Sequence, residues 1–110
     1  MAAAAASAGE ATRLAVVTGA NTGIGKEIAR ALGKAGGVHV IATSRDGPRG
    51  EAAVAELVAD GASVEAAVLD ISDPASVAAF AAFVDARHGG VVDILINNAG
   101  MAYKGDVFGA

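Results

Sequence analysis

The sequence predicts an α/β fold in which a doubly wound parallel sheet of about four strands is flanked by helices. Three observations support this prediction. Short apolar runs alternate with amphipathic segments of helical length from residue 13 onward, as expected for parallel strands joined by helical crossovers. The composition is 54% hydrophobic but only 4% aromatic, so small aliphatic side chains must fill the interior. A glycine-rich turn follows the first apolar run.

The first expected strand covers residues 14–18, and a helix of residues 23–35 follows it and ends at Gly36 and Gly37. A second strand, residues 38–43, leads through a turn at residues 46–48 into a helix that ends near residue 60, before Gly61. The apolar residues of each helix share a face, which we expect to pack on the sheet. These residues are Ile24, Ile28, Ala31 and Leu32 in the first helix, and Ala53, Val54, Leu57 and Val58 in the second.

The third expected strand covers residues 63–69. Asp73 has the character of an N-cap with Pro74 at the first helical position, and the helix runs to Gly89 and Gly90. Its apolar face is expected to consist of Val77, Phe80, Ala81 and Val84. A fourth strand lies near residues 93–96, so strands separated by single helices give a doubly wound sheet.

Length, charge and cysteine content restrict the function. A chain of 110 residues forms one domain at most, and residues 1–12 are an Ala-rich segment that we expect to be a disordered tail. The formal net charge is −4 without a basic cluster, so neither nucleic acid nor a membrane is an expected partner. The chain has no cysteine, which excludes disulfides and thiolate metal sites. No targeting pattern is recognisable, so we expect a cytoplasmic protein.

The turn between the first strand and the first helix contains three glycines, Gly19, Gly23 and Gly25, in the spacing Gly-x-x-x-Gly-x-Gly. A glycine backbone adopts positive φ and can approach a pyrophosphate closely, and the N-terminus of the helix attracts negative charge. The turn therefore indicates a phosphate site, although a tight loop without a ligand has the same glycine content.

Two better-known phosphate motifs do not fit this turn. A Walker loop requires glycine where Ala20 stands and Ser or Thr where Glu27 stands, so we expect Lys26 to be a solvated side chain. The common dinucleotide fingerprint has one residue between its first two glycines, whereas three residues separate Gly19 from Gly23.

Together with Asn97-Asn98-Ala99-Gly100, the glycine turn resembles the short-chain dehydrogenase/reductase family over residues 13–104. Residues 43–46 and 97–104 are most similar to the carbonyl reductases and to the menthone and salutaridine reductases. The resemblance implies a Rossmann-like sheet, with residues 13–110 as the incomplete N-terminal, cofactor-binding part of the domain. It implies an NADPH-dependent oxidoreductase that reduces a ketone, aldehyde or quinone by hydride transfer.

The resemblance also implies which residues bind NADP(H). They lie in the glycine turn, after the second and third strands, and after the fourth strand, where the strand order reverses. The expected cofactor-binding residues are Gly19, Asn21, Thr22, Gly23, Ile24, Gly25, Ser44, Arg45, Asp70, Ile71, Asn97, Asn98, Ala99 and Gly100.

The end of the second strand bears on the choice of dinucleotide. NAD-binding relatives of this fold place an acidic residue there for the ribose 2′-hydroxyl, but this chain has Ser44 followed by Arg45. A guanidinium contact to a 2′-phosphate favours NADP over NAD by about ten- to a hundred-fold. The alternative is a solvated Arg45 paired with Asp46, whose carboxylate would repel the phosphate.

Asp70 ends the third strand, where the resemblance implies that its carboxylate accepts a hydrogen bond from the adenine amino group while Ile71 packs on the ring. The alternative is that Asp70 only begins the turn into the next helix, a position for which Asp73 is the better cap. The resemblance gives Asn97 to Gly100 a role both in stabilising the sheet and in lining the cofactor.

No catalytic residue is expected in this chain. The resemblance implies a catalytic Ser and a Tyr-x-x-x-Lys pair, and Tyr103 with the adjacent Lys104 does not have that spacing. The isolated chain is therefore expected to be inactive, and the alternative is a non-catalytic nucleotide-binding or interaction module. His39 and His88 have no partner at metal-ligand spacing, so no metal site is predicted. The carbonyl substrate and the oligomeric state, monomer included, stay open.

Overall fold

The computed structural model of the chain describes residues 12–99 and confirms the α/β fold class. Within this range four parallel strands form one sheet in the order β3-β2-β1-β4. The strands are β1 (Arg13–Val17), β2 (Val38–Ser44), β3 (Val64–Val68) and β4 (Ile94–Ile96). The helices are α2 (Gly23–Gly33), α3 (Gly47–Ala59) and α4 (Pro74–His88). The order of strands along the chain reverses between β1 and β4, which is the switch point of a doubly wound sheet.

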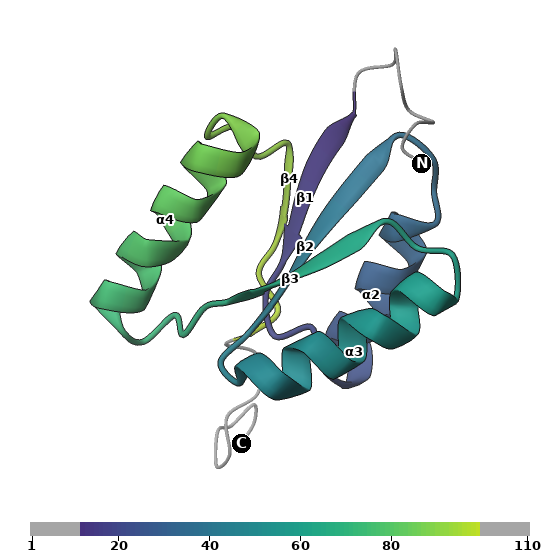
Figure 1. Ribbon diagram of the computed structural model, residues 1–110, viewed down its shortest axis with the longest axis horizontal. Coiled ribbons are helices and arrows are strands. Elements are labelled where there is room, and N and C mark those ends of the chain that lie inside the picture. The colour runs from purple at the N-terminus through teal and green to yellow at the C-terminus, as the bar shows by residue number, and fades with distance from the viewer. Residues whose placement is uncertain (1–11, 100–110) are drawn as a thin grey trace, which may run out of the picture.

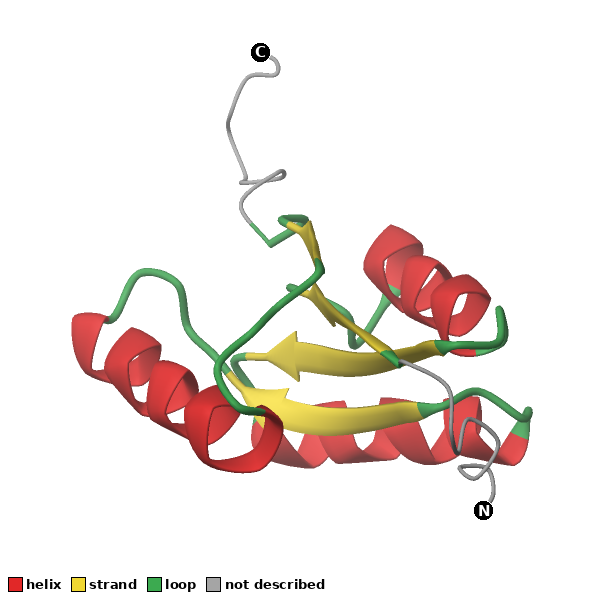
Figure 2. Cartoon of the chain, turned by 90° about the horizontal axis from the view of Figure 1, so that it is seen from above, coloured by secondary structure: helices red, strands yellow, loops and turns green. Residues whose placement is uncertain are grey.

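Helices cover both faces of the sheet. Helix α4 lies on one side of the strands, and α2 and α3 lie on the other (Figure 1). Successive strands are rotated relative to one another, as the twisted sheet in Figure 2 shows. The buried core on the α2 and α3 side includes Val17, Val40 and Leu57, whereas Val16, Ile41 and Val84 form the core under α4. Alternate residues of each strand therefore belong to different cores.

The expected inward face of α2 is only partly correct. Ile28 and Leu32 pack against the core, but Ile24 is 69% exposed and Ala31 is exposed. The residues closest to the sheet are small, and a Cβ on Gly33 would lie 2.8 Å from Val64 Cγ2. Because small residues let the helix approach the strands closely, they form the contact face and turn the larger side chains outward.

The other two helices show the same kind of difference. In α3, Ala53 and Leu57 are buried as expected, but Val58 is 52% exposed. In α4, Val84 is the one buried residue within the described chain, and Val77 and Ala81 are exposed. Phe80 is partly buried as expected, and Phe83, which the expected face omitted, packs beside it.

The predicted ends of α4 are confirmed, whereas α2 ends at Gly33, before the predicted end at residue 35. Asp73 is the N-cap of α4, where its Oδ1 accepts a hydrogen bond from the Ala75 amide at 3.0 Å. Asp46 caps α3 in the same way by accepting from the Arg49 amide at 2.9 Å. Helix α4 ends at Gly89, which has the positive φ of 75° typical of a glycine cap.

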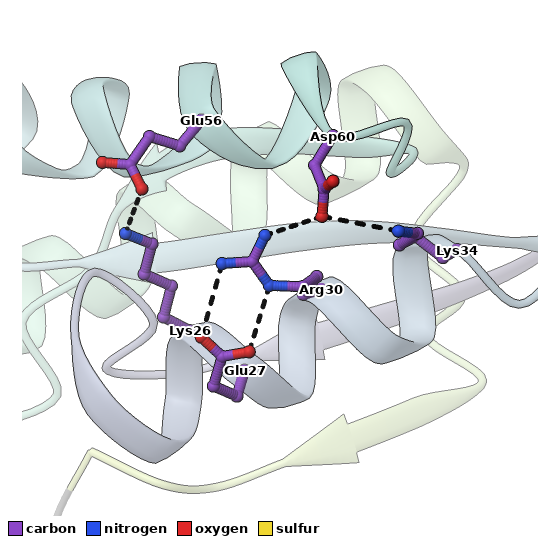
Figure 3. Close-up of polar contacts among 6 residues, drawn as sticks. All are labelled: Lys26, Glu27, Arg30, Lys34, Glu56 and Asp60. Carbon is purple, nitrogen blue, oxygen red and sulfur yellow. Dashed lines mark hydrogen bonds and ion pairs between the residues drawn. The ribbon is translucent and has the colours of Figure 1, made fainter.

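Helices α2 and α3 are joined by a row of ion pairs (Figure 3). Lys26 Nζ lies 2.6 Å from Glu56 Oε1, so Lys26 is paired and not simply solvated as expected. Arg30 Nη1 and Lys34 Nζ both contact Asp60 Oδ2, at 2.7 and 3.4 Å. The hydrogen bond from Arg30 and the charge of Lys34 hold the pKa of Asp60 below its ordinary value. Exposed pairs of this kind stabilise a fold only modestly.

Two sequence expectations fall partly or wholly outside the described residues. These are the disordered tail, of which the structure describes residue 12 alone, and the roles given to Gly100, Tyr103 and Lys104. No helix between residues 12 and 99 is long and apolar enough to cross a membrane.

Candidate dinucleotide site

We call the end of the sheet where the strands terminate the carboxyl edge; it carries Thr18, Arg45, Asp70 and Asn97. The glycine turn lies here, between β1 and α2. Gly19 and Gly23 have positive φ angles of 63° and 58°, which supports the reason given for glycine at these two positions. The Ala20 amide donates to the Thr43 carbonyl at 2.9 Å, so the turn is fixed to the end of β2.

The third glycine of the turn serves close packing. A Cβ on Gly25 would overlap the Gly19 carbonyl oxygen and lie 2.6 Å from Asn98 Nδ2. Gly25 is buried in the first turn of α2 and its φ is not positive. Its role is therefore steric: it allows the helix to begin directly against the turn and against the segment that follows β4.

Hydrogen bonds join the glycine turn to the Asn97–Ala99 segment. Thr18 Oγ1 accepts from the backbone amides of Asn98 and Ala99, both at 2.9 Å. Asn98 Nδ2 donates to the Gly19 carbonyl at 3.1 Å. Two parts of the chain about 80 residues apart thus form one rigid unit at the switch point. Thr18 is essential to this unit, yet it was not among the expected site residues; its place at the end of an apolar strand, just before Gly19, was the available signal.

The N-terminus of α2 differs from the other two helix N-termini within residues 12–99. Thr22 is the N-cap, but its side chain makes no capping hydrogen bond, whereas aspartates cap α3 and α4. As in α3 and α4, the first turn of α2 contains no acidic residue. Its free amides and the helix dipole therefore leave a favourable position for an anion beside the glycine turn.

Ser44 and Arg45 are placed differently from each other at the end of β2. The Ser44 hydroxyl is buried and donates to the Asp46 carbonyl at 2.9 Å, close to Gly50 of α3. Arg45 is exposed at the carboxyl edge. Of this pair, only the Arg45 side chain is therefore available to a ligand in this arrangement.

The charge of Asp46 is engaged by α3 and not by Arg45. Its Oδ1 caps the helix, and its Oδ2 lies 3.8 Å from the guanidinium of Arg49. The alternative pairing of Arg45 with Asp46 is not observed among the described contacts. Arg49 is a second exposed guanidinium beside the end of β2, and it was not among the site residues predicted from the sequence.

Asp70 takes part in the turn after β3. Its Oδ1 accepts from the amide and the hydroxyl of Ser72, at 3.0 and 2.6 Å. The hydroxyl and amide of Ser72, with a smaller contribution from the charge of Arg45, hold the pKa of Asp70 below its ordinary value of 3.8. The carboxylate therefore stabilises the turn, as the alternative interpretation expected, and stays ionised as a hydrogen-bond acceptor. Ile71 beside it is 45% exposed.

The remaining expected residues follow the same edge. Asn97 and Ala99 are exposed after β4, and Asn21 and Thr22 occupy the turn before α2. Ile24 is one of the α2 residues that line an open depression of about 770 Å³, together with Asn21 and Thr22. The structure thus gathers the glycine turn, Arg45, Asp70 and residues 97–99 at one edge of the sheet.

The fold is that of a doubly wound α/β protein, a class in which ligands bind across the sheet at the switch point. Residues 13–108 match the short chain dehydrogenase family, and the chain belongs to that family.

Among curated proteins, the chain is similar to carbonyl reductase [NADPH] 3 of Mus musculus. The two are 45% identical over 95 residues, which cover 86% of this chain but 34% of that protein. The chain therefore spans about a third of the length of the curated relatives it matches.

Two solved structures show the same fold at similar identity. Menthone neomenthol reductase from Mentha piperita is 46% identical with a TM-score of 0.74, over 79% of this chain and 31% of that one. A metagenomic short-chain oxidoreductase in complex with NADP is 45% identical with a TM-score of 0.73, over 84% and 41% of the two chains. The expected resemblance to carbonyl and menthone reductases is confirmed.

Proposed function

We propose that this chain is the cofactor-binding part of an NADPH-dependent reductase that transfers a hydride to the carbonyl group of a ketone, aldehyde or quinone. The observation that carries the proposal is the uncapped N-terminus of α2, locked through Thr18 and Asn98 to the segment after β4. The names of the related carbonyl reductases and the NADP complex of a related oxidoreductase support the cofactor and the reaction class.

The residues present fit a dinucleotide. The first-turn amides of α2 are not used by a side-chain cap and would hold the pyrophosphate, with Gly19 and Gly23 keeping the backbone free of side chains there. Asn21, Thr22 and Ile24 flank that position. Bound NADPH supplies the hydride; the chain's own residues bind and orient the cofactor.

Arg45 is the residue that we propose to read the 2′-phosphate. It is exposed at the end of β2, and the capping role of Asp46 reduces the repulsion that this carboxylate would exert on a phosphate. Arg49, in the first turn of α3, is a second exposed guanidinium close to the end of β2. Ser44 contributes to this site by positioning α3 through its hydrogen bond to Asp46.

The adenine and ribose positions follow from the same edge. Asp70 is ionised and Ile71 is half exposed, so a carboxylate acceptor and an apolar surface stand side by side after β3. Asn97, Asn98 and Ala99 would line the cofactor after β4, and Gly100 is proposed to continue that lining outside the described residues.

We further propose that the isolated chain binds the nucleotide without reducing a carbonyl compound. The sequence contains one tyrosine, Tyr103, and Lys104 is its immediate neighbour. A lysine must lie about one helical turn from a tyrosine on the same helix face to lower the pKa of its hydroxyl, so this pair cannot act as the proton donor in that way.

A second function of a different class shares the same site. A non-catalytic nucleotide-binding or interaction module would use the glycine turn and Arg45 without any hydride transfer. The open edge of β4, where Leu95 is 64% exposed among the described residues, is the feature that favours an interaction role. The two functions differ in turnover: a longer form of the chain with the Tyr-x-x-x-Lys pair reduces a ketone under the first and not under the second.

The test is a calorimetric titration of the chain with NADPH and, separately, with NADH. We expect saturable binding with a preference for NADPH of about ten- to a hundred-fold, and we expect Arg45→Glu to remove that preference. Arg13→Glu is the matched control, because it reverses the same charge at the other end of β1, away from the proposed site. Absence of nucleotide binding by the folded chain would contradict the site, and an unchanged NADPH to NADH ratio in Arg45→Glu would contradict the role of Arg45.

A further inference from the structure

We call the opposite end of the sheet the amino edge; it carries three side chains that the nucleotide site does not use, His39, Glu65 and His88. His39 lies in β2 and Glu65 in β3, on the face covered by α4. The register pairs Glu65 with Ile41, two residues beyond His39, so the two side chains are diagonal neighbours on one face. His88 is the last residue of α4 and reaches the same point from above the sheet.

The three polar groups lie close together. Nε2 of His39 and Nε2 of His88 are each 2.8 Å from Oε2 of Glu65. One potential ligand atom from each residue lies within 4.8 Å of the other two, and the three side chains are 19–28% exposed. Burial of Glu65 favours its neutral form, but hydrogen bonds from His39 and His88 outweigh it and hold the pKa of the carboxyl below its ordinary value. Glu65 is therefore a carboxylate facing two imidazoles.

We propose that His39, Glu65 and His88 form a binding site for Zn²⁺ or a similar divalent transition-metal ion, with Nε2 of each histidine and Oε2 of the glutamate as ligands. Two imidazoles and one carboxylate are a ligand set that zinc accepts in proteins, with a fourth position left for water. No metal site was predicted from the sequence, because residues 39, 65 and 88 are far apart along the chain.

Zinc binding requires the proton on each Nε2 to leave or to move to Nδ1, and it requires small movements of the three side chains. Zinc bonds of about 2.0–2.2 Å in a tetrahedron place ligand atoms about 3.4 Å apart. The two contacts to Glu65 must therefore lengthen by roughly half an ångström from 2.8 Å. The two histidine nitrogens are at most 4.8 Å apart and must approach each other to about 3.4 Å. A cavity of about 260 Å³ next to both histidines, lined also by Arg13, Leu14, Val91 and Asp93, gives room for a fourth ligand.

A neighbouring hydroxyl supports the ligand role of His39. Its second ring nitrogen, Nδ1, lies 2.7 Å from Oγ of Ser63. A histidine that binds a metal through one nitrogen commonly donates a hydrogen bond from the other, which fixes the orientation of the ring. Ser63 is therefore positioned as the group that holds His39 in the orientation for metal binding.

Two guanidiniums oppose a cation: Arg13 lines the neighbouring cavity, and Arg87 contacts Glu65 directly. Arg87 Nη2 lies 2.9 Å from Oε1 of Glu65, the oxygen that is not shared with the histidines, and the Arg87 side chain is 57% exposed. The Arg87 guanidinium can move into solvent, so it repels the metal ion by its charge but does not block the position of the metal. The metal would link β2, β3 and α4, which matters because α4 buries a single residue, Val84, among those described.

The first test is a zinc titration of the ¹⁵N-labelled chain, following the imidazole nitrogens by NMR. The sequence contains two histidines in total, so His39 and His88 account for all the imidazole signals. We expect both Nε2 resonances to shift together and saturate at one zinc per chain. Shifts of one ring only, no saturation, or no shift would overturn the proposal and leave the three residues as a hydrogen-bonded cluster. This measurement needs no variant.

Variants distinguish ligands from neighbours, with Co²⁺ absorption as the signature of tetrahedral coordination. We expect His39→Gln, His88→Gln and Glu65→Gln each to lower the affinity by more than about a hundred-fold, and Ser63→Ala by about ten-fold. The matched control is Glu56→Gln, which also removes an ion-paired carboxylate but lies between α2 and α3. Equal zinc affinity in Glu65→Gln and Glu56→Gln would contradict the site.

The variant Arg87→Gln distinguishes a metal site from a cluster that is held together by ion pairs alone. Removing the nearby positive charge should tighten zinc binding by about five-fold, because the guanidinium repels the metal ion. If the cluster were held together only by its ion pairs, the same change would weaken it and zinc would not bind more tightly. A lower zinc affinity in Arg87→Gln would therefore count against the proposal.

Discussion

The two ends of the sheet are built in different ways. At the carboxyl edge, the glycine turn and the Asn97–Ala99 segment are short contiguous stretches, and hydrogen bonds between backbone groups and the side chains of Thr18 and Asn98 join them. At the amino edge, single side chains from β2, β3 and α4 meet at one carboxylate. A site made of such stretches requires particular residues next to one another in sequence, so it leaves a local pattern. A side-chain cluster requires only that three elements pack together, so it leaves none.

The two edges also differ in charge. The carboxyl edge presents helix amides and the guanidiniums of Arg45 and Arg49, which favour an anion such as a phosphate. The amino edge presents a carboxylate between two imidazoles, which favours a cation. The difference can be tested by substituting residues at one edge and measuring ligand binding at the other.

The largest effect is expected at Gly25. In Gly25→Ala the added Cβ would overlap the Gly19 carbonyl, so the turn must move away from α2. We expect a loss of about 1–3 kcal/mol in the free energy of unfolding and a loss of NADPH affinity of about a hundred-fold. Denaturant unfolding and calorimetry measure the two effects.

The matched control for that change is Gly36→Ala at the amino edge. Gly36 has a φ of 47° with open space around it, so a Cβ there produces backbone strain without a clash. We expect a smaller stability loss of about 1–2 kcal/mol and unchanged nucleotide affinity. Nucleotide affinity that falls equally in both variants would show that Gly25 acts through general stability only.

The next largest effect is expected for Thr18→Val. Its hydroxyl accepts hydrogen bonds from two backbone amides after β4, and the side chain is 4% exposed, so both amides lose a buried partner. We expect a stability loss of about 1–3 kcal/mol and NADPH and NADH affinities lowered alike, by about ten-fold. Thr18→Ser keeps the hydroxyl and should bind nearly as the native chain does. An altered NADPH to NADH ratio would disagree with a role limited to positioning.

Asp70→Asn should have a smaller effect. The asparagine oxygen can still accept from Ser72, but it is a weaker acceptor for the adenine amino group, so both affinities should fall about three- to ten-fold. The pKa of Asp70 is lowered in the fold, so the carboxylate is ionised above its ordinary value of 3.8. The difference between the two proteins should therefore be constant above about pH 5 and decrease only as the pH falls through the lowered pKa. Affinities equal at neutral pH would rule out this contact.

The smallest expected effect is that of zinc binding at the amino edge on NADPH affinity at the carboxyl edge. His39 and Ser44 are five residues apart in β2, about 16 Å along an extended strand. Saturation of the amino edge with zinc should change the NADPH affinity by less than about two-fold, since separated sites usually act independently. Calorimetric titration of NADPH with and without zinc measures this. A change above ten-fold would show that the sheet couples the two edges.

Some expectations failed because they depend on packing. The apolar spacing of α2 identified a stripe containing Ile24 and Ala31, but Gly25 and Gly33 allow the helix to approach the strands on a different face. Helical spacing groups side chains, but it does not decide which group faces the sheet when small residues offer a closer contact. In the same way, the contacts that place Arg49 and Thr18 at the site could not be predicted from the sequence.

The sequence by itself determined the strand and helix order, the helix caps at Asp73 and Gly89, and the position of the glycine turn. These features depend on backbone conformation and on residues close together along the chain, so short patterns specify them. The tertiary structure decided the rotation of α2, the attachment of residues 97–99 to Thr18, and the meeting of His39, Glu65 and His88. Each of these depends on how closely distant elements pack, which spacing along one chain does not encode.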